Sequence, residues 1–273
     1  AAAKNHRYVA VVVRPESYDE VLSELEETGE LSAATRHWLA NEAFAYTARY
    51  DAAISRWFGR RYEALPTYWV TAWEKELDLS YGENPHQRAA LYVEPRAGSP
   101  VLSRVAKLHG RPLSFNNVLD LNSARSLLSD LEGDGCVITK HNNPCGVAEG
   151  ESIGAAYEAA FACDPMSAFG GVVALNRPVD RTLAERLHQQ FIEVLIAPAY
   201  EEGALEVLQQ KEAIRILEDT ERREHQIEPD IKRVRGGILV QDADGTPEPR
   251  ELMEVPTKTQ PTDEHWEDLL FAW

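Results

Sequence analysis

The sequence has only three cysteines, Cys136, Cys145 and Cys163, and no C-x-x-C pair. An odd number of separated thiols suits reduced cysteines better than a disulfide framework, which argues against a secreted scaffold. No window approaches the roughly 18 consecutive apolar residues that a membrane span needs, and the first residues lack the pattern of a signal peptide. We therefore expect a cytoplasmic protein.

Positive charge is scarce as well. The chain has 28 lysines and arginines against 45 aspartates and glutamates, which gives a formal net charge of −17. A field of that sign repels nucleic acids and anionic membrane surfaces, so we expect neither of them as a partner. An anionic small ligand would need a local basic pocket.

Several catalytic signatures are also missing. The zinc deaminases require H-x-E and P-C-x-x-C, and here "NPCG" (143–146) has no second cysteine at the required spacing. Neither the GK[ST] of the P-loop nor the G-x-S-x-G of serine hydrolases occurs. The sequence therefore predicts no metal ligand set.

The 273 residues suffice for one large domain or two ordinary ones. The β-branched run "RYVAVVV" (7–13) predicts a buried strand, and helices are predicted over 17–28 and 32–58. Ser32 can cap the second helix, whose apolar residues at 39, 43, 46, 50 and 54 share one face. These elements are typical of the end of an α/β unit.

Beyond residue 70 strands and helices alternate regularly. After the polar loop "YGENPHQ" (81–87) and its following strand we expect helix 117–131, strand "CVIT" (136–139), helix 152–163, strand "GVVAL" (171–175), helix 181–192, strand "VLIAP" (194–198), helix 201–210 and strand "AIRIL" (213–217). This order predicts an α/β fold with a mostly parallel sheet covered on both faces. Residues 219–262, rich in charge and proline, are expected to be an excursion and a linker.

Polar residues follow several of these strands. Because ligands sit at the carboxyl ends of parallel strands, we expect Lys140, His141, Asn176 and the loop after Ala197 along one edge of the sheet. In "DPMSAFGG" (164–171), Ser167 and two glycines place backbone amides where a ligand could meet them, although Gly-Gly before a strand is often only a turn.

In the stretch "ITKHNNPCG" (138–146), a buried strand is followed directly by a lysine, a histidine, two asparagines and a cysteine, all of which carry reactive or hydrogen-bonding side chains. Lys140 and His141 point to opposite sides of an extended backbone unless the chain turns, and Asn142-Asn143-Pro144 favours a turn. Gly146 permits a close backbone approach. A loop cap beside a surface lysine is the ordinary alternative. Cys145 has no base at fixed spacing, so we interpret it as packing.

Five strings together resemble one family. In order they are "YGENPHQRAALY", "LSFNNVLDLNSA", "ITKHNNPCGVA", "DPMSAFGGVVALN" and "VDRTLAERLHQQFIEVLIAPAYEEGALEVL". They are similar to the bifunctional purine-biosynthesis family that joins aminoimidazole carboxamide ribonucleotide (AICAR) formyltransferase to IMP cyclohydrolase. The strings "AAAKNH" and "LANEAFAYTARYDAAI" look like the end of that family's cyclohydrolase domain. The resemblance covers nearly the whole chain.

The resemblance implies a domain plan. Residues 1–70 correspond to the end of a methylglyoxal-synthase-like α/β cyclohydrolase domain, and 71–255 to the first transformylase subdomain, an α/β/α fold similar to cytidine deaminase without its zinc. Residues 256–273 correspond to a linker and the start of a second transformylase subdomain. A helix that opens at Thr262 stops in mid-pattern with Phe271 and Trp273 exposed. We therefore expect a piece of a longer protein, inactive by itself.

The resemblance also implies a reaction. In this family the amine of AICAR attacks the formyl group of the cosubstrate 10-formyltetrahydrofolate, and the other domain closes the product to IMP. The amine is a poor nucleophile, so a general base and a cation near the oxyanion suit the step. The positions that match the family's catalytic residues are His141 and Lys140 for formyl transfer and Lys4 for cyclisation. Its nucleotide-contacting positions match Ser80, Tyr81, His141, Gly170 and Glu193, and a homodimer with shared sites is implied.

Ser80 and Glu193 among these positions, and also three asparagine positions, need comment. Ser80 departs from the family pattern, where arginine usually precedes "YG" and would grip the nucleotide phosphate; either another cation takes that task or binding is weaker. Asn142 stands where threonine is common. Glu193 has an alternative interpretation as a solvated residue at a helix end. Asn116 and Asn117 have no expected role beyond turn or helix capping.

Two other functions stay open. The chain could be a non-catalytic dimerisation or scaffold piece, which comparing its activity with that of the complete protein would separate. It could also be an unrelated nucleotide-binding α/β domain, which would not discriminate aminoimidazole from other ribonucleotides in a titration.

Overall fold

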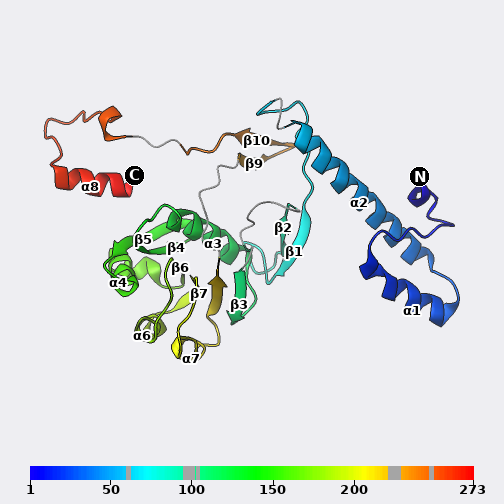
Figure 1. Ribbon diagram of the computed structural model, residues 1–273, viewed down its shortest axis with the longest axis horizontal. Helices are drawn as coiled ribbons and strands as arrows, with labels where there is room; N and C mark the ends of the chain where they lie inside the picture. Colours follow the sequence, from blue (N-terminus) through cyan, green and yellow to red (C-terminus); the bar gives the residue numbers. More distant parts are fainter. Residues whose placement is uncertain (60–62, 95–101, 103–104, 221–228, 246–248) are drawn as a thin grey trace. The chain divides into compact units, whose positions relative to one another are not determined.

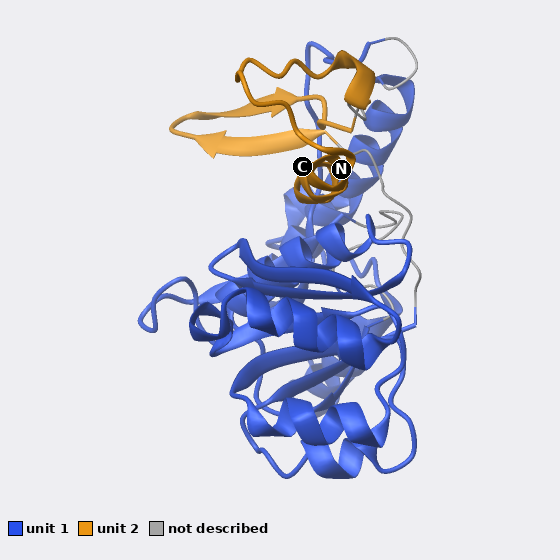
Figure 2. Cartoon of the chain, turned by 90° about the vertical axis from the view of Figure 1, so that its left-hand side faces the viewer, with its two compact units in different colours: residues 1–225 blue, residues 226–273 orange. Residues whose placement is uncertain are grey.

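The computed structural model describes residues 1–59, 63–94, 102, 105–220, 229–245 and 249–273. The chain divides into two compact units, residues 1–225 and residues 226–273 (Figure 2). The segments expected from the sequence, 1–70, 71–255 and 256–273, are defined by resemblance rather than by compactness. They stay a prediction.

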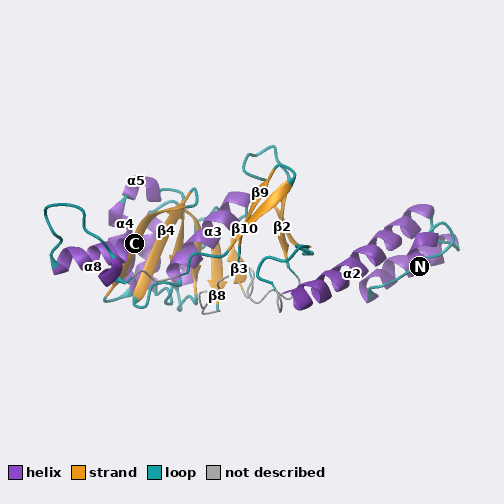
Figure 3. Cartoon of the chain, turned by 90° about the horizontal axis from the view of Figure 1, so that it is seen from above, coloured by secondary structure: helices purple, strands orange, loops and turns teal. Residues whose placement is uncertain are grey.

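The first unit begins with helices. Two short 3-10 turns, η1 (Ala2–Asn5) and η2 (Pro15–Ser17), precede the helices α1 (Tyr18–Thr28) and α2 (Ala33–Gly59). Figure 3 shows α2 as one long continuous helix. Both predicted helices are confirmed. The predicted cap is also present, because the Ser32 hydroxyl accepts a hydrogen bond from the Thr35 amide at 3.1 Å.

The predicted strand over residues 7–13 is wrong. This run forms no strand, and Val11 and Val13 instead pack against Ala3, Ala40 and Ala43. The β-branched residues are partly buried, as their hydropathy demands, but a strand also needs a hydrogen-bonded neighbour. No strand in the described ranges pairs with this segment.

The apolar face predicted for α2 is buried only in its first half. Leu39 and Ala43 are buried, whereas Tyr46, Tyr50 and Ile54 farther along the same face are exposed. The helical period was therefore predicted correctly. The cover for the second half does not lie among the described residues of this unit.

A hairpin leads into the main sheet. Strands β1 (Glu74–Leu79) and β2 (Ala89–Val93) pair antiparallel around the "YGENPHQ" loop, and a hydrogen bond from the Gly82 amide to the Gln87 carbonyl, 2.8 Å, closes that loop. Leu79 and Leu91 pack against the hydrophobic cluster beneath α3. The expected strand after the loop is confirmed.

The central sheet has six strands in the order β3-β8-β7-β6-β4-β5 (Figure 1). Their bounds are β3 Val105–His109, β4 Asp134–Lys140, β5 Asn143–Gly150, β6 Gly171–Leu175, β7 Ile192–Ala197 and β8 Arg215–Asp219. Only the β6–β7 and β7–β8 pairs are parallel; the β3–β8, β4–β5 and β4–β6 pairs are antiparallel. The α/β class is confirmed, but the sheet is mixed rather than mostly parallel. Sequence patterns carry burial and not strand direction, which explains the error.

Helices cover both faces of this sheet. Helix α3 (Phe115–Leu128) packs on the face that carries Val137, Val172 and Val194, whereas α4 (Ile153–Cys163), α6 (Arg181–Gln189) and α7 (Ala204–Leu208) pack on the face that carries Ile138, Val173 and Leu195. Successive strand residues alternate between the faces, so both cores follow the two-residue period. The predicted helices 117–131, 152–163, 181–192 and 201–210 all exist, with ends displaced by a few residues or less.

The direction of β4 overturns one expectation about the sheet edge. Because β4 runs antiparallel to β6, its last residues lie beside the first residues of β6, where Thr139 pairs with Val172. Asn176 follows the last residue of β6 and binds the opposite end of β4, with its side-chain oxygen accepting from the Gly135 amide at 2.8 Å. Lys140 and Asn176 therefore lie at opposite ends of the strands, and we call these two borders of the sheet its edges. The loop after Ala197 lies on the Asn176 side.

The second unit contains a hairpin and a helix. Strands β9 (Asp230–Val234) and β10 (Gly237–Gln241) pair antiparallel, and η3 (Arg250–Leu252) and α8 (Asp263–Ala272) follow. This hairpin was not predicted, because the stretch 219–262 that contains it is rich in charge and proline. Thr262 caps α8 as expected, accepting from the His265 amide at 3.2 Å. Across the parts of the chain that are described, no helix combines the length and the apolarity of a membrane span.

Candidate functional site

The edge where β4 ends and β6 begins gathers most of the predicted site residues. Lys140 is the last residue of β4, and its ammonium donates to the Phe169 carbonyl at 2.5 Å, just before β6. Gly170 separates Phe169 from that strand. The cation is thereby held beside the start of a neighbouring strand rather than extended into solvent.

Gly170 makes a sharp connection into β6. Its φ is 75°, in the left-handed region, and its amide donates to the Phe191 carbonyl at 2.8 Å. A Cβ at this position would also lie 3.2 Å from the Phe191 ring, so a larger residue would be both strained and crowded. The backbone at Gly170 is consequently fixed next to the start of β7.

Glu193 lies in β7 and not at a helix end, which rules out the alternative interpretation of this residue as a solvated helix terminus. Its carboxylate accepts a hydrogen bond of 2.8 Å from the Asn117 side-chain amide, and the Arg215 guanidinium is 3.7 Å away. Asn117 and Arg215 are both buried. The carboxylate is therefore oriented by buried groups from two other elements.

Asn117 also begins helix α3. Its side-chain oxygen accepts from the Ser114 amide at 3.0 Å, while the Ser114 hydroxyl accepts from the Asn117 amide at 3.2 Å. This reciprocal capping box satisfies two amides that a helix start would otherwise leave without partners. The predicted capping role is confirmed, and the link to Glu193 is an addition that no local pattern signals.

Ser80 and Tyr81 lie at the same helix start. The amide and hydroxyl of Ser80 both donate to the Leu113 carbonyl, at 2.8 and 3.1 Å, and the Phe115 amide donates to the Tyr81 carbonyl at 3.0 Å. The short Ser80 side chain is thus engaged with the backbone. It supplies no positive charge at this end of the site.

His141 occupies a tight hairpin turn. His141 and Asn142 have φ values of 53° and 63°, and they join β4 to β5 as a two-residue loop. The turn was expected over residues 142–144 but lies one residue earlier, since Asn143 and Pro144 belong to β5. Proline is tolerated there because β5 is the last strand of the sheet.

Two neighbouring predictions have structural outcomes. Gly146 does permit a close approach, but the group that approaches is the Ala160 carbonyl of α4. Cys145 packs against the main hydrophobic cluster, and burial raises the pKa of its thiol, which agrees with the packing role.

Ser167 serves the local fold. Its hydroxyl and amide donate to the Asp164 carboxylate at 2.6 and 3.0 Å, capping the short helix α5 (Pro165–Ala168). These hydrogen bonds, the hydroxyl first, lower the pKa of Asp164. The Ser167 amide, which was expected to be available to a ligand, therefore already donates to Asp164 within the protein.

The fold thus brings together six of the seven predicted site residues: Ser80, Tyr81, Lys140, His141, Gly170 and Glu193. Lys4 stands apart, as an exposed residue of η1. Within the described ranges there is no group of three or more His, Cys, Asp or Glu side chains that could hold a metal ion. Asp120 and Arg215, which contact this edge, were not predicted, because nothing in their sequence spacing marks them.

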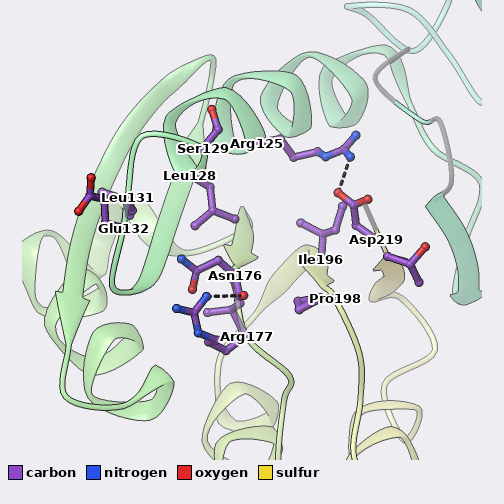
Figure 4. Close-up of a pocket in the computed structure, with 12 residues that line it drawn as sticks. Arg125, Leu128, Ser129, Leu131, Glu132, Asn176, Arg177, Ile196, Pro198 and Asp219 are labelled. Carbon is purple, nitrogen blue, oxygen red and sulfur yellow. Dashed lines mark hydrogen bonds and ion pairs between the residues drawn. The ribbon is translucent and has the colours of Figure 1, made fainter. Parts of the chain in front are cut away.

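A separate pocket of about 250 Å³ lies at the opposite edge, beyond the carboxyl ends of β6, β7 and β8 (Figure 4). Both of its arginines are engaged with protein partners: Arg125 pairs with Asp219, and Arg177 pairs with Asp134 at 2.8 Å. Asn176 spans this edge, with its amide nitrogen donating to the Gly133 carbonyl at 2.8 Å. These contacts serve the fold of the edge.

The fold and the edge with Lys140 define an α/β protein whose polar site is assembled on a mixed sheet from several separate strands. Sequence comparison makes this class specific. The model of the AICARFT/IMPCHase bienzyme family matches residues 2–273, and the chain belongs to that family. The resemblance noted from the five strings is confirmed.

Individual relatives agree with this assignment. The chain is 42% identical over 274 aligned positions to the "Bifunctional purine biosynthesis protein PurH" of Bacillus cereus (strain AH187), covering 100% of this chain and 54% of that protein. The protein of the same name from Bacillus mycoides (strain KBAB4) is 41% identical with the same coverage. The chain spans about half the length of the curated relatives it matches.

Proposed function

We propose that the complete protein containing this chain acts in purine biosynthesis, transferring the formyl group of 10-formyltetrahydrofolate to AICAR and closing the product to IMP. The main support is the convergence of Lys140, His141, Gly170 and Glu193 on one sheet edge, although they are separated by up to 53 residues in sequence. Membership in the bienzyme family supports the same reaction.

In the proposed mechanism, Lys140 at the end of β4 and His141 in the turn that follows have different roles. His141 accepts the proton of the AICAR amine as the amine nitrogen attacks the formyl carbon. The Lys140 ammonium stabilises the negative charge that develops on the formyl oxygen. The bond between the formyl carbon and N10 of the folate then breaks, and the proton passes to N10, which leaves tetrahydrofolate and formylated AICAR.

The remaining edge residues would hold the nucleotide. Tyr81, Gly170 and Glu193 are proposed contacts, and the hydrogen bond from Asn117 supports a fixed carboxylate at Glu193. Ser80 is proposed to contact the nucleotide without neutralising its phosphate, because serine carries no charge. The phosphate would then be bound by a different cation.

The rest of the domain plan belongs to the same proposal. Residues 1–70 would end the cyclohydrolase domain, with Lys4 acting in ring closure, 71–255 would form the first transformylase subdomain, and 256–273 would lead into the second. A cytoplasmic homodimer with shared active sites completes it. The exposed apolar side chains of α2, including Phe44 and Tyr50, support an interface on that helix.

The test uses the complete protein with His141 replaced by alanine. We expect His141→Ala to lower the rate constant of formyl transfer about 100-fold or more, the usual loss for a positioned acid or base. Cyclisation of added formylated AICAR should continue, because that reaction belongs to another domain. Lys140→Ala should slow the same step, with Lys107→Ala, an exposed lysine of β3, as the matched control.

Melting temperature measured on the same preparations separates catalysis from folding. A role of His141 confined to capping its loop would lower the melting temperature and leave the rate per folded molecule intact. Normal formyl transfer by folded His141→Ala protein would therefore refute the proposed mechanism.

A further inference from the structure

The turn that carries His141 is strained. His141 and Asn142 are the two non-glycine residues with positive φ in the described part of the chain. Left-handed backbone is unfavourable for a residue with a side chain, and two-residue hairpins of this type prefer Asn-Gly. Asparagine and histidine adopt this region more often than most residues with a side chain, but less readily than glycine, so this turn needs support from its surroundings.

Helix α3 supplies that support through one carboxylate. Asp120 accepts hydrogen bonds from both turn amides, from His141 at 3.2 Å and from Asn142 at 2.6 Å. Ser123, one helical turn farther along the same face, donates to the Asn142 side-chain oxygen at 2.5 Å. Helix α3 is therefore hydrogen-bonded to the backbone of both turn residues and to the side chain of Asn142.

Helix α3, which carries Asp120 and Ser123, is itself held in place by a cap and by packing on the sheet. Helix α3 is capped at Ser114 and packs on β4 and β6 through the buried residues Val118, Leu121 and Ala124 (Figure 1). Asp120 is thus fixed relative to the strand that ends at Lys140. Hydrogen bonds from amides to a carboxylate are also stronger than neutral ones.

We infer that Asp120 is a positioning residue for formyl transfer, which sets the left-handed backbone from which the His141 imidazole projects. This inference rests on the proposed function for its catalytic consequence. The hold of Asp120 on the turn does not depend on it. A displacement of a catalytic group by about 1 Å can lower a rate about 100-fold, so a looser turn would be costly.

The kinetic test compares three variants of the complete protein. Asp120→Ala should lower kcat for formyl transfer about 10-fold to 100-fold, with a smaller change in KM. Adding Asn142→Gly to Asp120→Ala should recover at least part of that loss, because glycine adopts positive φ without the side-chain penalty. Asn122→Ala, an exposed neighbour on α3, is the matched control and should leave kcat unchanged.

Amide hydrogen exchange provides a readout that is independent of activity. In Asp120→Ala, the His141 and Asn142 amides should exchange at least about tenfold faster, while amides in the core of β4 keep their protection. Faster exchange, together with a lower kcat that Asn142→Gly partly restores, would support the inference. Unchanged exchange would overturn it, and so would faster exchange with a normal kcat per folded molecule.

The outcome for His141→Ala keeps the two proposals apart. If that variant transfers formyl groups normally, the proposed function fails, whatever Asp120 does to the turn. If His141→Ala is inactive and Asp120→Ala is normal in both kcat and amide exchange, the proposed function stands and the role assigned to Asp120 is wrong.

Discussion

Asn117 joins the start of α3 to the candidate site, so its removal should cost more than an exposed asparagine would. Only 3% of Asn117 is exposed. In Asn117→Ala the buried Ser114 amide loses its hydrogen-bond acceptor, which costs about 1–3 kcal/mol of stability. The bond to Glu193 adds only about 0.5–1 kcal/mol, since that carboxylate is partly exposed and solvent screens it. We expect the free energy of unfolding to fall by about 1.5–4 kcal/mol in total.

The adjacent residue offers a matched control. Asn116 makes only a 3.4 Å contact with the Glu83 carbonyl, so Asn116→Ala should change the free energy of unfolding by no more than about 0.5 kcal/mol. Urea unfolding of the chain, followed by circular dichroism, measures both variants. Asn117→Asp separates the two bonds, because its carboxylate still accepts from Ser114 but repels Glu193.

The result that would refute this reasoning is equal stability of Asn117→Ala and Asn116→Ala. The capping box and the bond to Glu193 would then contribute nothing measurable. An Asn117→Asp variant as stable as the natural chain would likewise show that Glu193 is not held at this position.

Two further predictions concern titration and reactivity. Burial and the nearby Glu218 raise the pKa of Tyr200, so the unfolded chain ionises first and the free energy of unfolding should fall above about pH 10. In denaturation series from pH 8 to 11, Tyr200→Phe should show a shallower fall, and an identical slope would contradict the assignment. Iodoacetamide should modify the exposed Cys163 before Cys145, whose thiol pKa is raised by burial, and the buried Cys136 only after unfolding. Peptide mapping over time gives this order, and early labelling of Cys136 would count against the described core.

Local elements of this protein follow from the sequence because short-range interactions create them. The helices α1, α2 and α4 come from apolar periodicity, and capping residues such as Ser32 at α2 and Thr262 at α8 act within one turn of their own positions. The family resemblance came from the same local strings. It identified candidate residues, of which six converge on one edge.

The tertiary structure alone decided where these residues meet. Strand direction depends on pairing between distant segments, so only the structure shows that β4 runs against β6 and carries Lys140 to the edge opposite Asn176. The same holds for Asp120 and Asn117, whose partners lie 21 and 76 residues away along the chain. The apolar pattern of residues 7–13 likewise did not suffice to predict a strand. The composition of a segment indicates whether it is buried, but a strand also requires a neighbouring segment with which to form hydrogen bonds.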